Sequence, residues 1–204
     1  MNRKYYTGIV LAVALVIIGA GCKSICFNSQ RDQPRYALTA KLIEGSSLEF
    51  KRIGSNLNWS STYVNDSDIA AILRSPSVAV VNFPSLTVRV GETKKASNQH
   101  YIRYPFTYDK IGNPDKFETR GIGQKIQARL VEAKNSEATV EVFAESVQEP
   151  TWITYSRLPE IRQPVFQARS FEPTVTISLN RWFSTGGLVI TNNTAVFIMK
   201  ITKE

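Results

Sequence analysis

Few side chains in this sequence combine the type and the spacing that catalysis or metal binding needs. The single histidine, His100, lies in a polar loop without a neighbouring cysteine or carboxylate pair to act with it in acid–base chemistry. Asp66 and Asp68 suit the first turn of a helix better than a metal site, because no third ligand is near them in the sequence. Glu141 and Glu145 share one face of a predicted strand and indicate its solvated side. Since the sequence also lacks G-x-S-x-G, P-loop, H-E-x-x-H and paired C-x-x-C motifs, we predict a protein that is not an enzyme and has no metal site or cofactor.

The cysteine with the most informative surroundings is Cys22, because of the segment that precedes it. Arg3 and Lys4 give a basic start, and Gly8 to Gly21 is an apolar run without a charged side chain. The run closes on the small residues Gly19-Ala20-Gly21. This order is typical of an export signal, and the run is shorter than the ~20 residues that a membrane-spanning helix needs.

Small residues directly before a cysteine resemble the bacterial lipoprotein signal. In that family the thiol receives a diacylglycerol and the preceding peptide is removed, so the resemblance implies a signal peptide over residues 1–21 and lipid attachment at Cys22. Gly19 departs from the larger aliphatic residue that the family usually carries there, although Ile18 lies one step back. Lys23 replaces the aspartate that often retains lipoproteins in the inner membrane, which by analogy favours the outer membrane, facing the periplasm. An uncleaved membrane anchor and a plain cleaved signal are the alternatives.

Composition narrows the remaining possibilities. The length suits a single domain, and 25 basic against 17 acidic side chains give a formal charge of +8, which falls to +6 without Arg3 and Lys4. These charges are scattered rather than gathered in a basic block, so we predict no nucleic-acid partner. With Cys22 acylated only Cys26 remains, which excludes an internal disulfide and favours a free thiol.

The domain organisation follows from polarity and alternation. Residues 22–35 are polar and aperiodic, and we expect a lipidated flexible tether followed by a folded domain over residues 36–204. Within this domain, extended segments are expected at Tyr36–Glu44, Leu48–Ile53, Val78–Asn82, Leu86–Val90, Tyr101–Tyr108, Ile122–Val131, Ala138–Val147, Val175–Leu179, Leu188–Thr191 and Ala195–Ile201.

These segments predict a mainly β fold, an antiparallel β-sheet domain with one short helix. The helix is expected where apolar residues recur at helical spacing between a cap at Asp66 or Ser67 and a stop at Pro76. Lys94–Gln99 is expected to be a polar loop, and Pro105 indicates an edge strand or a bulge because it lacks an N–H.

Several short segments then match a known family in order along the chain. They are Ile43-Glu44 followed by Gly54 and Leu57-Asn58-Trp59, Ile72–Val78, Val88–Glu92, Gly121–Leu130, Thr174–Leu179 and Gly186–Leu188. Together they resemble the C-terminal homology domain of secretins, the outer-membrane multimers of type II and type III secretion and type IV pilus systems. The resemblance implies a secretin-like β domain that works by self-association or by assembly with other envelope proteins.

This chain also departs from the secretin pattern. Only about ten residues separate Trp59 from the short helix, where a secretin normally carries a long insertion that helps to build its inner gate. The small α/β modules that usually precede the domain are missing, and the chain ends soon after Gly187 without the closing segment. The resemblance therefore implies a reduced secretin-like domain rather than a channel formed by this chain alone.

Aromatic side chains recur in one predicted strand, at Tyr101, Tyr104, Phe106 and Tyr108. Alternation places Ile102 on the same face as the last three, and the set could form a girdle at a bilayer interface, a platform for a ligand, or ordinary packing. Our hypothesis is a lipid-anchored cell-envelope protein that acts by assembly. The rival hypothesis is a monomeric β-sandwich lipoprotein that binds a ligand or partner through this aromatic face.

Overall fold

The computed structural model describes residues 33–52, 62–157, 160–190 and 193–204. The chain divides into Met1–Pro34 and Arg35–Glu204, and the second unit contains all the helices and strands given below. Our predictions for Cys22, Cys26 and the Leu57-Asn58-Trp59 segment lie outside the described residues.

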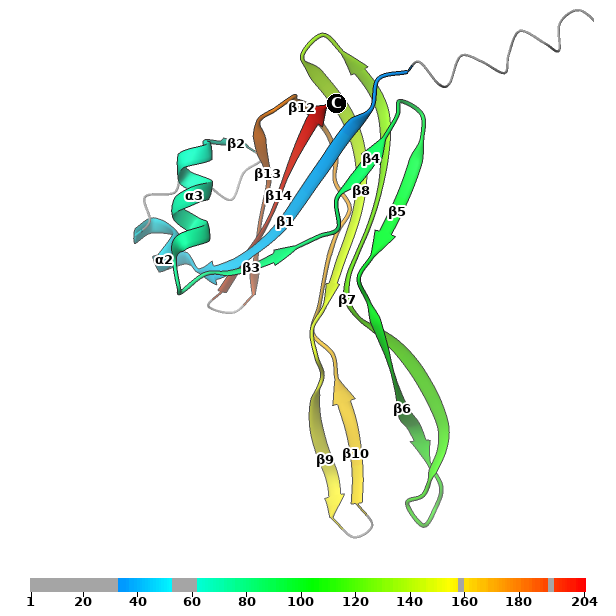
Figure 1. Cartoon of the computed structure of the whole chain (residues 1–204). Coiled ribbons are helices and arrows are strands. Elements are labelled where there is room, and N and C mark those ends of the chain that lie inside the picture. Colours follow the sequence, from blue (N-terminus) through cyan, green and yellow to red (C-terminus); the bar gives the residue numbers. More distant parts are fainter. Residues whose placement is uncertain (1–32, 53–61, 158–159, 191–192) are drawn as a thin grey trace, which may run out of the picture. The chain divides into compact units, whose positions relative to one another are not determined.

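Antiparallel strands dominate the described chain, and the prediction of a mainly β fold is confirmed (Figure 1). The strands are β1 (Tyr36–Ser46), β2 (Thr62–Val64), β3 (Ala79–Asn82), β4 (Leu86–Val88), β5 (Thr93–Ser97), β6 (His100–Tyr108), β7 (Pro114–Lys134), β8 (Glu137–Val147), β9 (Thr151–Arg157), β10 (Glu160–Val165), β11 (Ala168–Phe171), β12 (Thr174–Ser178), β13 (Trp182–Ile190) and β14 (Asn193–Lys203). The helices are α2 (Ser47–Arg52) and α3 (Asp66–Arg74).

The strands form two large sheets and one separate hairpin. Sheet 1 has the order β2-β13-β14-β1-β3, with β4 beside β1. Sheet 2 has the order β11-β8-β7-β5, with β12 beside β8 and β6 beside β7, and β9 pairs with β10. Strands β1 and β14 run together along their whole length, from Tyr36 opposite Lys203 to Ser46 opposite Asn193.

The core lies between the two sheets, and a smaller core lies behind sheet 1. Alternation along β14 sends Phe197 and Met199 to the core between the sheets, and Val196 and Ile198 to the smaller one, which includes α2 and α3 residues. A strand covered on both faces must be apolar at successive positions, which explains the buried run in this strand. The predicted inward face of the first strand is confirmed, since Tyr36, Leu38, Ala40 and Leu42 are all buried.

The expected short helix is present, and its boundary differs by one residue. The N-cap of α3 is Asn65, so Asp66 and Asp68 lie in the first turn rather than at the cap. There their charges favour the helix N-terminus. The helix buries Ile69 and Ile72 and ends at Arg74, close to the predicted stop.

Two predicted conformations are wrong, and in both segments the surrounding structure determines the secondary structure. The expected extended segment Leu48–Ile53 is helical over Ser47–Arg52, where the Ser46 hydroxyl accepts the Glu49 N–H at 3.1 Å and Phe50 is buried. The expected polar loop is largely strand β5, in which Lys94, Lys95 and Ser97 pair with β7. Strand β7 supplies backbone hydrogen-bonding partners along β5, so β5 can form without alternating apolar and polar residues.

In the part of the chain that the structure describes, an ion pair joins the two sheets. Glu44 of β1 lies 3.2 Å from Arg169 of β11, measured from Oε1 to Nε, and the side chains are only 17% and 19% exposed. These two atoms form no aligned hydrogen bond, so the attraction is that of an ion pair, while Gln148 donates to the other Glu44 oxygen at 3.4 Å. Replacing Arg169 by Met should therefore lower the free energy of unfolding by about 2 kcal/mol, because a largely buried carboxylate loses its cation.

Denaturant unfolding of the single and double variants tests this value. The Glu44→Leu/Arg169→Met double variant should recover part of the loss, since no uncompensated charge is left. Lys134→Met is the matched control, because Lys134 is 79% exposed beside Glu132 and its replacement should leave the free energy of unfolding nearly unchanged. Equal losses in Arg169→Met and Lys134→Met would contradict the prediction.

Candidate functional site

Two hairpins continue beyond the two packed sheets (Figure 1), and strand β6 of the first hairpin carries the four aromatic residues that we predicted as a site. Strand β7 is 21 residues long; its first part pairs with β6, and the part from Gly123 to Lys134 pairs with β8. The β6–β7 hairpin is therefore an extension of sheet 2. The β9–β10 hairpin follows β8 directly along the chain.

These hairpins carry most of the exposed large hydrophobic side chains of the described residues. Of the twelve large hydrophobic side chains found exposed there, eight lie on the two hairpins or in the β6–β7 loop. They are Tyr101, Phe106, Ile111, Phe117, Trp152, Ile153, Tyr155 and Val165. Exposed apolar side chains gathered in one region indicate a surface that contacts another molecule or an apolar phase.

The structure divides the four predicted aromatic residues into two pairs. The ladder with β7 shifts register between Pro105 and Thr107, which confirms the predicted bulge and leaves Phe106 without a partner in β7. The expectation that Phe106 shares a face with Tyr104 and Tyr108 is therefore wrong. Tyr101 and Phe106 are exposed, whereas the other two are partly buried.

Tyr104 contacts its neighbouring strand and Phe166, which directly follows the second hairpin. Its hydroxyl donates to the Glu118 carboxylate at 2.9 Å, and its ring lies 5.2 Å from that of Phe166. Burial, followed by the hydrogen bond to Glu118, raises the pKa of Tyr104 above its ordinary value. Tyr104 is thus a packing residue of the hairpin rather than a free platform.

The tip of the β6–β7 hairpin is held by one carboxylate. Asp109 accepts the backbone N–H groups of Ile111 at 2.9 Å and Asn113 at 2.8 Å, and the Asn113 side-chain amide at 3.2 Å. The backbone hydrogen bond from Asn113 is the main cause that lowers the pKa of Asp109 below its ordinary 3.8. The ionised form is therefore the one that orders the tip.

We expect this tip to loosen in acid. A carboxylate whose pKa is lowered by folding contributes its stabilisation above the ordinary pKa and loses it as pH falls through the folded value. Amide resonances of Ile111 and Asn113, followed by NMR, should therefore hold steady at neutral pH and shift only below about pH 4. Asp109→Asn should remove this titration, and a shift that persists in Asp109→Asn would contradict the assignment.

Open strand edges lie on both sides of sheet 2 and its hairpins. Within the described ranges, β5 and β6 pair only with β7, while β10 pairs only with β9 and both β11 and β12 only with β8. An unpaired edge presents backbone N–H and C=O groups that accept a further strand. Two opposite edges on one chain suit head-to-tail pairing between copies.

The β9–β10 hairpin is the part of this site that our sequence reasoning missed. Its first strand reads TWITYSR, in which β-branched and aromatic residues follow one another. That composition is a strand signal that the sequence offered. It was hidden because both faces are largely exposed, so no alternation of apolar and polar residues marks it.

The other candidate residues lie apart and pair locally. His100 lies 3.0 Å from Glu149, and both side chains are more than half exposed. Glu141 pairs with Arg129 at 3.5 Å and Glu145 with Lys125 at 2.7 Å, on the face of β8 that alternates with its buried residues. Across the residues that the structure describes, no group of three His, Cys, Asp or Glu side chains could hold a metal ion.

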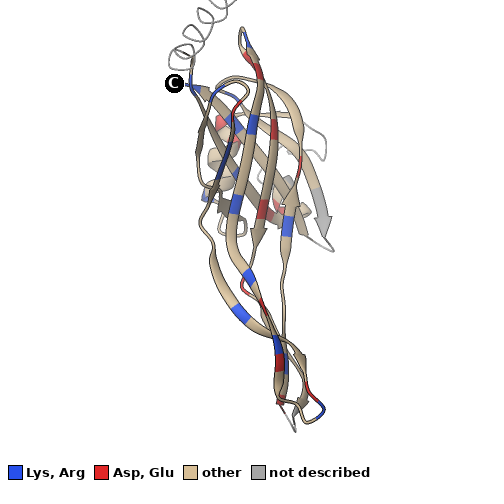
Figure 2. Ribbon diagram, turned by 90° about the vertical axis from the view of Figure 1, so that its right-hand side faces the viewer, with Lys and Arg blue, Asp and Glu red and all other residues tan. Residues whose placement is uncertain are grey.

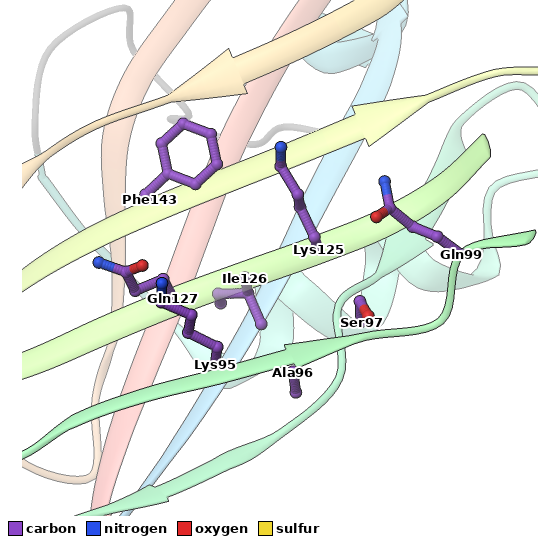
Figure 3. Close-up of a pocket in the computed structure, with 8 residues that line it drawn as sticks. All are labelled: Lys95, Ala96, Ser97, Gln99, Lys125, Ile126, Gln127 and Phe143. Carbon is purple, nitrogen blue, oxygen red and sulfur yellow. The ribbon is translucent and has the colours of Figure 1, made fainter. Parts of the chain in front are cut away.

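A pocket of about 420 Å³ lies on sheet 2 (Figure 3). Lys95, Lys125 and Phe143 are among the residues that line it, and the Lys125 ammonium lies 5.1 Å from the Phe143 ring centroid. None of the four predicted aromatic residues lines this pocket. It therefore gives no support to a ligand bound on the aromatic strand.

Charges are distributed along the strands rather than collected in a patch. Figure 2 shows Lys and Arg residues interspersed with Asp and Glu residues on sheet 2 and on the hairpins. Short ion pairs such as Lys94 with Glu92 at 2.8 Å neutralise part of the positive charge. Neither helix of the described chain has the length and apolar character that crossing a membrane requires.

Comparisons with known proteins find a similar fold among solved structures. No family model matches the sequence, and no curated protein matches it significantly. Among solved structures, the chain is similar to InvG, the Salmonella SPI-1 type III secretion injectisome secretin, at 11% identity and a TM-score of 0.53, covering 97% of this chain and 70% of that one. It is equally similar to InvG in the basal body with PrgH and PrgK, where it spans 50% of the InvG chain.

A pilus protein gives a comparable match. The V. cholerae type IV competence pilus secretin PilQ is 7% identical with a TM-score of 0.52, covering 97% of this chain and 65% of that one. Likenesses at such low identity establish the fold alone. The chain has a secretin-like fold, and the predicted resemblance is confirmed at that level.

Proposed function

We propose that this secretin-like domain is a non-enzymatic component of the cell envelope that works by assembly, with copies of itself or with a larger partner, in a secretion- or pilus-type complex. The observation that carries the proposal is the pair of open edges, β5 with β6 on one side and β10 to β12 on the other. Main-chain hydrogen bonds between such edges would join copies head to tail, and a closed rotation would give a ring.

The proposed site in the envelope is the outer membrane, with the domain facing the periplasm. Residues 1–21 are the proposed signal peptide, Cys22 the lipid attachment site, residues 22–35 the tether and residues 36–204 the assembling domain. Several acyl chains on one cysteine would anchor the protein firmly, since each buried methylene contributes about 0.8 kcal/mol. The exposed aromatic residues of the hairpins, such as Tyr101 and Trp152, suit a membrane interface.

The mass of the detergent-extracted protein tests both parts of this proposal. Light scattering would compare the wild type with Cys22→Ala, and Cys26→Ala is the matched control because it removes a cysteine four positions further on. We expect a large, discrete oligomer for the wild type and for Cys26→Ala, with acyl chains found by mass spectrometry on Cys22. The Cys22→Ala protein should be absent from the membrane fraction and should assemble poorly.

A single copy in all three proteins, at every concentration, would rule out self-assembly. An oligomer that is unchanged in Cys22→Ala would keep the assembly and remove the lipid anchor. The rival hypothesis, a monomer that binds a ligand through the aromatic strand, has weaker support. Contacts with neighbouring residues already occupy Tyr104 and Tyr108, which leaves Tyr101 and Phe106 as the free aromatic surface.

A further inference from the structure

The two hairpins touch each other through the strands that also carry open edges. Strand β6 reaches β10 by two hydrogen bonds that cross between the hairpins. The Tyr108 hydroxyl of β6 donates to the backbone carbonyl of Arg162 in β10. In return, Gln163 Nε2 of β10 donates to the backbone carbonyl of Phe106 in β6 at 3.4 Å.

Both accepting carbonyls lie where their own strand is irregular. The β6 ladder shifts register around Phe106, and the β10 ladder shifts between Ile161 and Arg162. A bulge disrupts the local ladder and redirects the backbone and side chains beside it. The two strands are thus irregular at matching places, where each receives a side chain from the other.

The contact between the hairpins is made by side chains beside a groove. Strands β6 and β10 share no backbone ladder within the described residues. A groove of about 310 Å³ is lined by residues of both hairpins, among them Pro105, Tyr108 and Trp152. A third contact, the ring pair of Tyr104 and Phe166, lies beside it. Such a contact can open without unfolding either hairpin.

We propose that the β6–β10 contact is a latch, which holds the two hairpins of a free copy together and occupies edge carbonyls until another copy displaces it. Each open edge is then covered, in part, by the opposite edge of the same chain. Assembly requires the hairpins to separate. The backbone carbonyls of Phe106 and Arg162 then lose their side-chain donors and accept hydrogen bonds from the backbone of a neighbouring strand. This inference rests on the proposed function only in naming a second copy as the displacing partner.

The test uses the full chain in detergent and a pair of double variants. Tyr108→Phe/Gln163→Leu removes both donors of the latch. Tyr36→Phe/Gln127→Leu makes the same chemical changes in the two sheets, away from the β6–β10 contact, at side chains for which the described structure shows no hydrogen bond. Amide hydrogen exchange of β6 and β10 is measured at a dilution where the protein is monomeric. The rate of assembly is measured by light scattering after the protein is concentrated.

In the latch variant we expect amide exchange in β6 and β10 to rise about tenfold, because two neutral hydrogen bonds are lost. Assembly should also accelerate about tenfold, while the control should match the wild type in both measurements. A latch variant with unchanged exchange would overturn the proposal, and so would slower assembly, which would place the contact between copies rather than within one.

The two proposals fail in different ways. If the wild type never assembles, the self-assembly part of the proposed function is wrong, and exchange in the single copy still decides whether a latch exists. A covalent lock adds a second measurement: p-benzoylphenylalanine at Phe166 should cross-link to β6 of the same chain on illumination, near Tyr104. Locked copies should fail to assemble, and normal assembly of locked copies would also overturn the latch.

Discussion

Replacing Phe197 by Ala is expected to lower the free energy of unfolding by about 3–5 kcal/mol. Phe197 is completely buried in β14, at the centre of the core between the two sheets. Its ring stacks on Phe171 of sheet 2 with centroids 5.2 Å apart, and meets the edge of Phe83 at 5.6 Å. Removing the ring leaves a cavity at the place where the sheets are joined, so both sheets lose contacts together.

Denaturant unfolding followed by tryptophan fluorescence gives this value. Phe117→Ala is the matched control, since Phe117 is 45% exposed and its main contact is the Arg103 guanidinium, 4.3 Å from the ring centroid. That cation–π contact is worth about 0.5–1 kcal/mol at an exposed site, so the control should lose no more than that. If Phe197→Ala were as mild as the control, the two sheets would not share one core in solution.

Replacing Gly123 by Ala is expected to destabilise the junction between the sandwich and the β6–β7 hairpin by about 3 kcal/mol. Gly123 has a φ of +112°, and a β-carbon added there would lie 2.6 Å from the backbone oxygen of Asn98. The clash cannot relax easily, because Asn98 is fixed by two hydrogen bonds to Gln124, at 2.9 Å and 3.0 Å. We therefore expect the hairpin to swing away from its native direction and assembly to fail.

Gly121→Ala separates this effect from a general loss of glycine. A β-carbon at Gly121 would meet only the flexible side chain of Gln99, at 3.2 Å, so the loss should stay below about 1 kcal/mol. Unfolding free energy and light scattering would be measured on both variants. Similar stability of Gly123→Ala and Gly121→Ala would show that the junction tolerates a side chain.

The latch and the junction together suggest how the hairpins are directed. Gly123 and Asn98 fix where the β6–β7 hairpin leaves sheet 2, and Tyr108 with Gln163 fix it against the other hairpin. The first contact depends on backbone geometry and the second on two side-chain donors. Variants of the first should therefore affect stability and assembly together, whereas variants of the second should change assembly with little loss of stability.

The sequence by itself determined the parts of the fold that bury one face of a strand. Leu38, Ala40 and Leu42 alternate with polar residues because one face of β1 contacts the core, and the same holds for Val140 and Val142 in β8. The short helix was marked by apolar spacing and a proline stop. The resemblance to secretins rested instead on short motifs matched in order along the chain, such as Ile72–Val78 and Gly121–Leu130.

Only the tertiary structure decided the parts that carry the candidate site. Strand β5 is polar and forms because β7 extends beside it, and α2 is helical because Phe50 packs behind sheet 1. The bulge at Phe106 depends on the pairing of β6 with β7, and the latch joins Tyr108 to Arg162, which is 54 positions away. Local periodicity reports burial on one face of one segment, whereas strand register and edge contacts are set by partners that are distant in the sequence.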